Sequence, residues 1–100
     1  MQKENNYQLS NKADKDLSDI ANYTIETFGL KQAHIYKNGL IETFLFLASN
    51  PKRGRDFFLN NGFSVKRFKY KSHVIFFQKT IKGILILRIL GGKMDFEKHL

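Results

Sequence analysis

The sequence predicts an α+β fold in the order β-α-α-β-β-β, in which an antiparallel two-helix hairpin packs on a small antiparallel sheet. Two patterns predict it. Residues 11–47 place apolar side chains at spacings of three and four, the period of a helix. Residues 64–90 form short apolar or alternating runs between turn residues, as strands do. The only proline, Pro51, lies between them in Ser49-Asn50-Pro51-Lys52-Arg53-Gly54, a cluster typical of a loop.

The first elements are a short strand and a capped helix. Tyr7-Gln8-Leu9 predicts the N-terminal strand. Ser10 or Asn11 can then cap a helix, because a short side-chain oxygen accepts from the free N–H groups of the first turn. One apolar stripe follows, formed by Ala13, Leu17, Ile20, Ala21, Thr24 and Phe28. Gly29 suits the end of this helix, because glycine adopts a left-handed conformation at low steric cost.

The second helix is expected from about residue 31 to residue 47. One of its faces carries Ala33, Tyr36, Leu40, Phe44 and Leu47. The short link at Phe28-Gly29-Leu30 predicts an antiparallel hairpin. Gly39 weakens the helix by about 1 kcal/mol relative to alanine, and close approach of the two helices would explain it. Phe44 and Phe46 lie on different faces, so one of them can remain exposed to a partner.

Three strands are expected after the loop, at about residues 64–70, 72–79 and 83–90, with tight turns at Lys71-Ser72 and Lys82-Gly83. Alternation places Phe68 and Tyr70 on one face of the first of these strands and Val65, Arg67 and Lys69 on the other. The last two strands are apolar on both faces. The face away from the helices therefore needs a cover, which either the chain's own tail or another protein can supply. The tail, residues 94–100, suits a short C-terminal helical turn or an extended arm.

Length and composition indicate one domain over residues 1–100 with a core of its own. The chain has no cysteine, and its N-terminus, Met1-Gln2-Lys3-Glu4-Asn5-Asn6, lacks the apolar stretch of a signal peptide. Its apolar runs, such as residues 84–87, fall far short of the roughly 20 residues that span a membrane. We therefore expect a cytoplasmic protein.

The positive charge is concentrated in the second half of the chain. The formal net charge is +8: residues 1–50 carry five lysines against six acids, and residues 51–100 carry twelve Lys or Arg against three acids. Such a field attracts nucleic acid, an anionic membrane or an acidic protein. Charge alone does not choose among these partners.

Several stretches, in this order and spacing, resemble the RelE/ParE toxin superfamily, and ParE in particular. They are Tyr7-Gln8-Leu9-Ser10, Ala13, Asp16-Leu17, Ile20, Tyr23-Thr24, Phe28-Gly29, Leu47-Ala48, Asn50-Pro51, Gly54-Arg55, Arg67-Phe68-Lys69-Tyr70-Lys71-Ser72-His73-Val74-Ile75-Phe76-Phe77, Arg88-Ile89-Leu90, Met94-Asp95 and His99-Leu100. After Arg88-Ile89-Leu90, ParE-like sequences usually carry His, whereas this chain has Gly91-Gly92-Lys93. No role of that His carries over.

The resemblance implies the toxin of a type II toxin–antitoxin pair. ParE proteins inhibit DNA gyrase and trap it on broken DNA, and a ParD-like antitoxin neutralises them. The N-terminal part of such an antitoxin binds operator DNA as a dimer, and its C-terminal segment wraps the toxin. The expected partners are thus an acidic antitoxin and gyrase, with operator DNA reached only through the antitoxin and no membrane.

We expect the partner-binding residues on the strands and the tail. Arg88 has apolar neighbours at Ile86 and Leu90, so it should either meet a carboxylate or lie at the rim of a groove. Apolar contacts should set the affinity, with charge helping speed and register. The candidate residues are Arg67, Lys69, Lys71, His73, Arg88, Lys93, Met94 and Phe96, with weaker phosphate or target contacts at Lys52, Arg53 and Arg55.

The alternative is a ribosome-dependent mRNA endonuclease of the RelE type. Such chemistry needs a proton-transferring group, and His73 is the candidate, although a histidine bonded to a neighbouring backbone or side-chain group is the favoured interpretation. No spacing of histidines and carboxylates suggests a metal site. We therefore expect no catalytic residue, metal or cofactor. A third reading, a plain nucleic-acid-binding domain, predicts binding that weakens steeply with salt.

Overall fold

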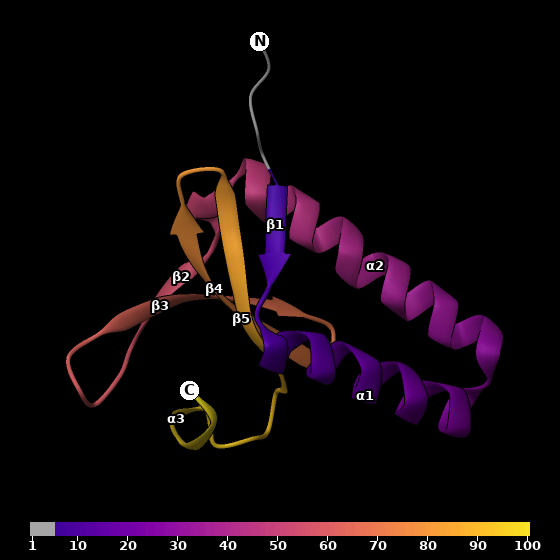
Figure 1. Cartoon of the computed structure of the whole chain (residues 1–100). Helices are drawn as coiled ribbons and strands as arrows, with labels where there is room; N and C mark the ends of the chain where they lie inside the picture. The colour runs from indigo at the N-terminus through magenta and orange to yellow at the C-terminus, as the bar shows by residue number, and fades with distance from the viewer. Residues whose placement is uncertain (1–5) are drawn as a thin grey trace, which may run out of the picture.

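A computed structural model describes residues 6–100 and confirms the α+β prediction (Figure 1). The prediction that the N-terminus lacks a signal peptide falls largely on residues 1–5, which lie outside the described part. The elements are β1 (Asn6–Leu9), α1 (Asn11–Phe28), α2 (Leu30–Ser49), the 3-10 turn η1 (Pro51–Arg53), β2 (Arg55–Phe58), β3 (Ser64–Tyr70), β4 (His73–Thr80), β5 (Gly83–Gly91) and α3 (Phe96–His99). In the described part, no helix is both long and apolar enough to cross a membrane.

The sheet is mixed, not wholly antiparallel. Its strand order is β1-β5-β4-β3-β2, and β1 runs parallel to β5 while the other neighbours are antiparallel. Parallel pairing requires a long connection, which the intervening elements provide. Gly83 allows this pairing, because a Cβ there would collide with the carbonyl oxygen of Asn6. The β4–β5 turn is formed by Ile81 and Lys82, one residue earlier than expected.

The sequence prediction omitted one strand, β2. It is only four residues long and follows directly on the Pro51–Gly54 cluster, so its pattern was too short to distinguish from loop. It pairs with β3, placing Phe57 opposite Val65 and Asp56 opposite Lys66. The Asp56–Lys66 ion pair, 2.9 Å, reinforces that register. β2 is therefore an edge strand of the sheet.

The two helices form the expected antiparallel hairpin. Ser10 is the N-cap of α1, and its Oγ accepts from the Ala13 N–H at 3.0 Å. Gly29 joins the helices with a φ of 94°, a value that favours glycine. Phe28, predicted for the core, is 65% exposed because α1 outruns the sheet there. Gly39 is explained by a strand, not by the other helix: a Cβ there would collide with the Tyr70 hydroxyl.

Each face of the sheet has its own apolar cluster. The helix face packs against α1 and α2 and includes Leu40, Phe44, Leu47, Ile75, Phe77, Ile84, Ile86 and Ile89. The opposite face carries Val65, Val74, Phe76 and Leu90, with Phe57, Leu87 and Phe96 packed against them. As predicted, Phe44 is buried and Phe46 is exposed. The tail forms a helical turn, α3, rather than an extended arm.

Candidate partner-binding face

The sheet face opposite the helices, which we call the tail face, is covered in part by α3. Three rings join the tail to the sheet: Phe96 lies 4.9 Å from Phe76 and 5.9 Å from Phe57, and Phe57 lies 5.5 Å from Phe76 (centroid distances). Edge-to-face pairs of this kind add about 0.5–1.5 kcal/mol each beyond area burial. Of the two covers that the sequence left open, the chain therefore supplies one itself.

Polar contacts also hold the tail. The Glu97 carboxylate accepts from the Asn60 backbone N–H at 3.0 Å. The Arg67 guanidinium lies over the rings of Phe57 and Phe96, 5.9 and 5.4 Å from their centroids. A cation over an aromatic face is worth about 0.5–1 kcal/mol at an exposed site. Arg67, a predicted partner contact, thus also steadies the tail.

Arg88 meets a carboxylate of its own chain. Its Nε and Nη2 donate to the two oxygens of Asp16 at 2.8 and 2.9 Å, and its Nη1 donates to the His99 carbonyl at 2.9 Å. Asp16 also accepts from the Ile89 N–H. The hydrogen bond that Arg88 donates to Asp16 raises the pKa of Arg88, against the opposing effect of burial. Arg88 therefore ties α1, β5 and the tail together.

A β-bulge places Arg88 on the tail face. Phe76 pairs with Arg88 and Phe77 with Ile86, so Leu87 has no residue opposite it. Strict alternation had put Ile86 beside Arg88. The extra residue turns Ile86 to the helix face, while Arg88 and Leu90 keep the tail face. The expectation that Ile86 and Leu90 flank Arg88 on one face is corrected: Arg88 shares the tail face with Leu87 and Leu90.

A depression of about 630 Å³ adjoins the β3–β4 turn and brings four predicted residues together. Lys69, Lys71, Lys93 and Met94 line it beside Gly91 and Gly92. Lys71 lies in the predicted Lys71-Ser72 turn, with a φ of 52°. Gly92 donates to the Ser72 carbonyl at 2.9 Å, which holds the tail segment against that turn. Three exposed cations around an apolar Met94 fit a segment with acids and an apolar anchor.

A second depression, about 410 Å³, lies at the β2 end of the sheet. Arg53, Arg55, Arg67, Lys69 and Phe68 line it. Arg55 and Arg67 are opposite each other in the strand register, and like charges in that position repel. The two groups of cations that the sequence treated separately, loop and strand, are therefore one positive surface, and a bound anion would relieve the repulsion.

His73 lies on the helix face, and of the other predicted contacts Lys71 lines the same depression. Its Nδ1 is 2.7 Å from the Tyr36 hydroxyl, and it pairs with Tyr70 across the strands. Burial lowers the pKa of His73, with the negative charge of Asp16 opposing that effect. A depression of about 490 Å³ beside it is lined by Tyr23, Phe28, Tyr36 and Lys71, among others. The bond to Tyr36 agrees with a histidine held by a neighbouring group.

Asp16 and Tyr36 are the residues whose roles sequence reasoning missed. Asp16 is 72 positions from Arg88, and Tyr36 is 37 from His73, so no local pattern links the partners. Asp16 stood out only within the family resemblance. Within residues 6–100, no group of three His, Cys, Asp or Glu side chains could hold a metal.

Comparison with known proteins decides the family. The family described as "ParE toxin of type II toxin-antitoxin system, parDE" matches residues 7–96. The chain belongs to the ParE toxin family. It is 34% identical over 95 residues to Toxin ParE1 of Caulobacter vibrioides, with 94% of this chain and 96% of the relative covered. It is 29% identical over 96 residues to Toxin ParE1 of Mycobacterium tuberculosis strain H37Rv, with the same coverage.

The fold is also shared with a chain of a solved structure. A chain of the structure "Chromosomal ParDE TA system from P. aeruginosa" superposes with a TM-score of 0.72, covering 85% of this chain and 92% of that one at 21% identity. At that identity the likeness concerns the fold. Together with the family match, it confirms the resemblance seen in the sequence.

Proposed function

We propose that this ParE toxin arrests growth by binding and inhibiting DNA gyrase, without turning over a substrate, and that a ParD-like antitoxin neutralises it. Family membership over residues 7–96 is the observation that carries this proposal. The gyrase target comes from the resemblance. The described residues contribute an exposed cationic surface that suits binding.

The antitoxin site in this proposal is the exposed remainder of the tail face. The depression around Lys69, Lys71, Lys93 and Met94 offers cations with an apolar side chain among them. An acidic, amphipathic segment would match both features. Apolar anchors would contribute about 1.5–3 kcal/mol each when fully buried, and exposed ion pairs only about 0–1 kcal/mol each.

Purified toxin and gyrase test the target directly. We expect loss of negative supercoiling and accumulation of cleaved DNA when toxin is in excess. Induction of the toxin alone in cells should give growth arrest with a DNA-damage response. Normal supercoiling in the presence of excess folded toxin would contradict the proposal.

The antitoxin site is tested best at exposed lysines. Lys69→Glu with Lys93→Glu should weaken binding of a ParD-like C-terminal segment, because both charges that face its acids are reversed. Lys31→Glu with Lys37→Glu on α2 makes the same change in net charge away from this surface. Equal loss in both pairs would mean that the tail face is not the antitoxin site. Arg88→Glu should weaken the complex too, but it also sets a carboxylate beside Asp16, so it reports on folding as well.

The messenger-RNA nuclease alternative rests on His73. Its lowered pKa keeps the imidazole neutral at pH 7, as a general base requires, and Lys71 lies in the same depression. The binding proposal predicts that His73→Ala retains full toxicity and that translated messages stay intact in primer extension. Discrete cuts that vanish in His73→Ala would favour the nuclease.

A further inference from the structure

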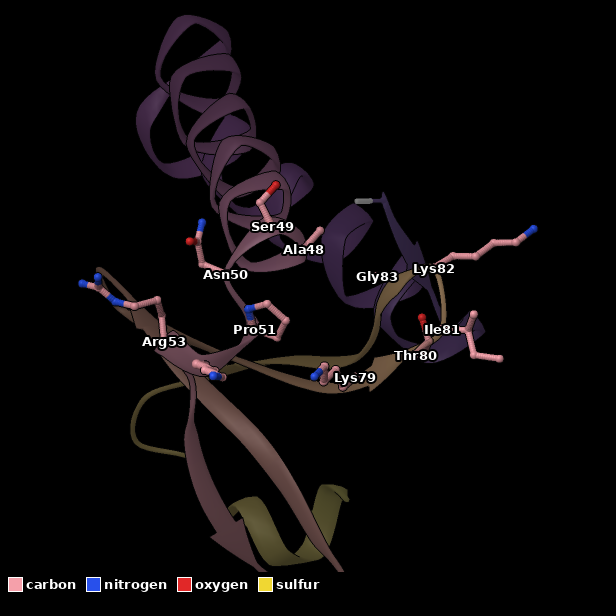
Figure 2. Close-up of a pocket in the computed structure, with 11 residues that line it drawn as sticks. Ala48, Ser49, Asn50, Pro51, Arg53, Lys79, Thr80, Ile81, Lys82 and Gly83 are labelled. Carbon is pink, nitrogen blue, oxygen red and sulfur yellow. The ribbon is translucent and has the colours of Figure 1, made fainter. Parts of the chain in front are cut away.

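A fourth concave surface lies where the end of α2 and η1 meet the β4–β5 turn (Figure 2). At about 670 Å³, it is larger than the three depressions described above. Four of its lining residues are cations: Lys52 and Arg53 from η1, Lys79 from β4 and Lys82 from the turn. Its lining includes no acidic residue. We call these four residues and their depression the hairpin patch.

The fold does not use these charges. The ion pairs within residues 6–100 are Lys15–Asp19, Lys66–Asp56 and Arg88–Asp16, so the hairpin patch takes part in none. The free carbonyls at the end of α2 would attract cations. Asn50 already donates to one of them: its side-chain Nδ2 and its backbone N–H both bond to the Phe46 carbonyl, each at 2.9 Å. Among the four, Arg53 alone has a ring contact, over Phe46.

Two cations of the hairpin patch, Arg53 and Lys82, extend away from each other. Figure 2 shows Arg53 and Lys82 extending from opposite sides of the depression, with Lys79 between them in this view. A single small anion would need converging donors. Outward-spread cations instead suit an extended polyanion, whose charges are repeated along its length. Duplex DNA carries one charge per about 1.7 Å of its axis.

We infer that the hairpin patch binds the phosphate backbone of duplex DNA. The choice of DNA rests on the proposed function, because gyrase works on a DNA duplex. Lys52, Lys79 and Lys82 would each contact phosphate. Ile81, fully exposed at the tip of the turn beside Lys82, would meet the sugar edge of the same groove. Contact with the DNA held by gyrase would add to contacts with the enzyme itself.

Salt dependence of DNA binding tests this inference without gyrase. Fluorescence anisotropy of a short labelled duplex, titrated with toxin across a salt series, gives the slope of log affinity against log salt. The triple variant Lys52→Gln, Lys79→Gln, Lys82→Gln should lower the magnitude of that slope by about 2–3 and affinity by at least about tenfold. The control triple Lys12→Gln, Lys31→Gln, Lys37→Gln removes the same charge from exposed helix positions and should keep a slope close to that of the parent protein.

Three results would overturn the inference: equal slopes in the two triples, no DNA binding by the parent protein at moderate salt, or equally tight binding of oligoglutamate with the same number of charges. A gyrase assay on the same proteins separates this inference from the proposed function. If both triples keep the salt slope of the parent and inhibit gyrase like the parent, DNA contact by the hairpin patch is rejected and gyrase inhibition stands. If the parent binds DNA through the patch yet leaves gyrase unaffected, the inference stands and the proposed target fails.

Discussion

The two faces of the sheet are covered in very different ways. The helix face is sealed by 38 residues of α1 and α2, and its large side chains, such as Phe44 and Phe77, are completely buried. The tail face is covered by the four residues of α3, anchored by one ring, Phe96, and by the contacts of Arg88 and Glu97. The first face holds most of the buried apolar side chains, although Phe76 on the second face is also completely buried. The second leaves room beside its cover for a partner.

The largest effect is expected on the helix face. Phe44→Ala should lower the free energy of unfolding by about 4 kcal/mol, because a fully buried ring leaves a cavity behind. Urea unfolding followed by far-UV circular dichroism measures it. Phe46→Ala, at a 40% exposed position on the same helix, is the matched control and should change stability by less than about 1 kcal/mol. Equal effects would mean that the two faces of α2 do not differ as described.

The second effect concerns the link between the faces. Asp16→Ala should lower the free energy of unfolding by about 3 kcal/mol, because it leaves the mostly buried Arg88 without its carboxylate. Asp19→Ala removes an exposed partner of Lys15 on the same helix and should cost no more than about 0.5 kcal/mol. If Arg88→Met in the Asp16→Ala background recovers part of the lost free energy of unfolding, the unpaired Arg88 charge causes the loss. No recovery would mean that the loss comes from the Ile89 N–H, which also loses its acceptor, Asp16.

The tail, residues 94–100, should detach from the sheet before the rest of the fold unfolds. Phe96→Ala should lower the free energy of unfolding by about 2 kcal/mol, since this ring is only partly buried. Amide exchange in residues 94–100 should rise far more than exchange in β4 and β5. If exchange rose uniformly, the tail would be an integral part of the core and not a separate cover.

The smallest effect is a pH dependence on the helix face. Burial lowers the pKa of His73 below its ordinary value of 6.5, so the unfolded chain binds the proton first as pH falls. The free energy of unfolding should therefore decrease as pH drops through about 6.5 and level off below the folded pKa. His73→Gln should lack this contribution, while His34→Gln, at an exposed helix position, should retain it. The same slope in His73→Gln would assign the titration elsewhere.

Local patterns determined most of the secondary structure. The period of three and four predicted both helices, and the Ser10 cap and Gly29 link predicted where they begin and end. Alternation placed Val65 and Arg67 on the face opposite Phe68. β2 was not predicted, because four residues after a proline cluster carry too little periodicity. Phe28 was wrongly predicted for the core, because an apolar stripe on a helix does not show where the sheet beneath the helix ends.

By itself, then, the sequence determined the helical hairpin, four of the five strands, the positive second half and the family resemblance, because these depend on neighbours along the chain. Only the tertiary structure decided that Arg88 bonds to Asp16, that His73 bonds to Tyr36, and that loop and strand cations share one surface at Arg55 and Arg67. Those contacts join residues far apart in sequence, and their geometry depends on a bulge and a parallel edge strand that no local pattern encodes.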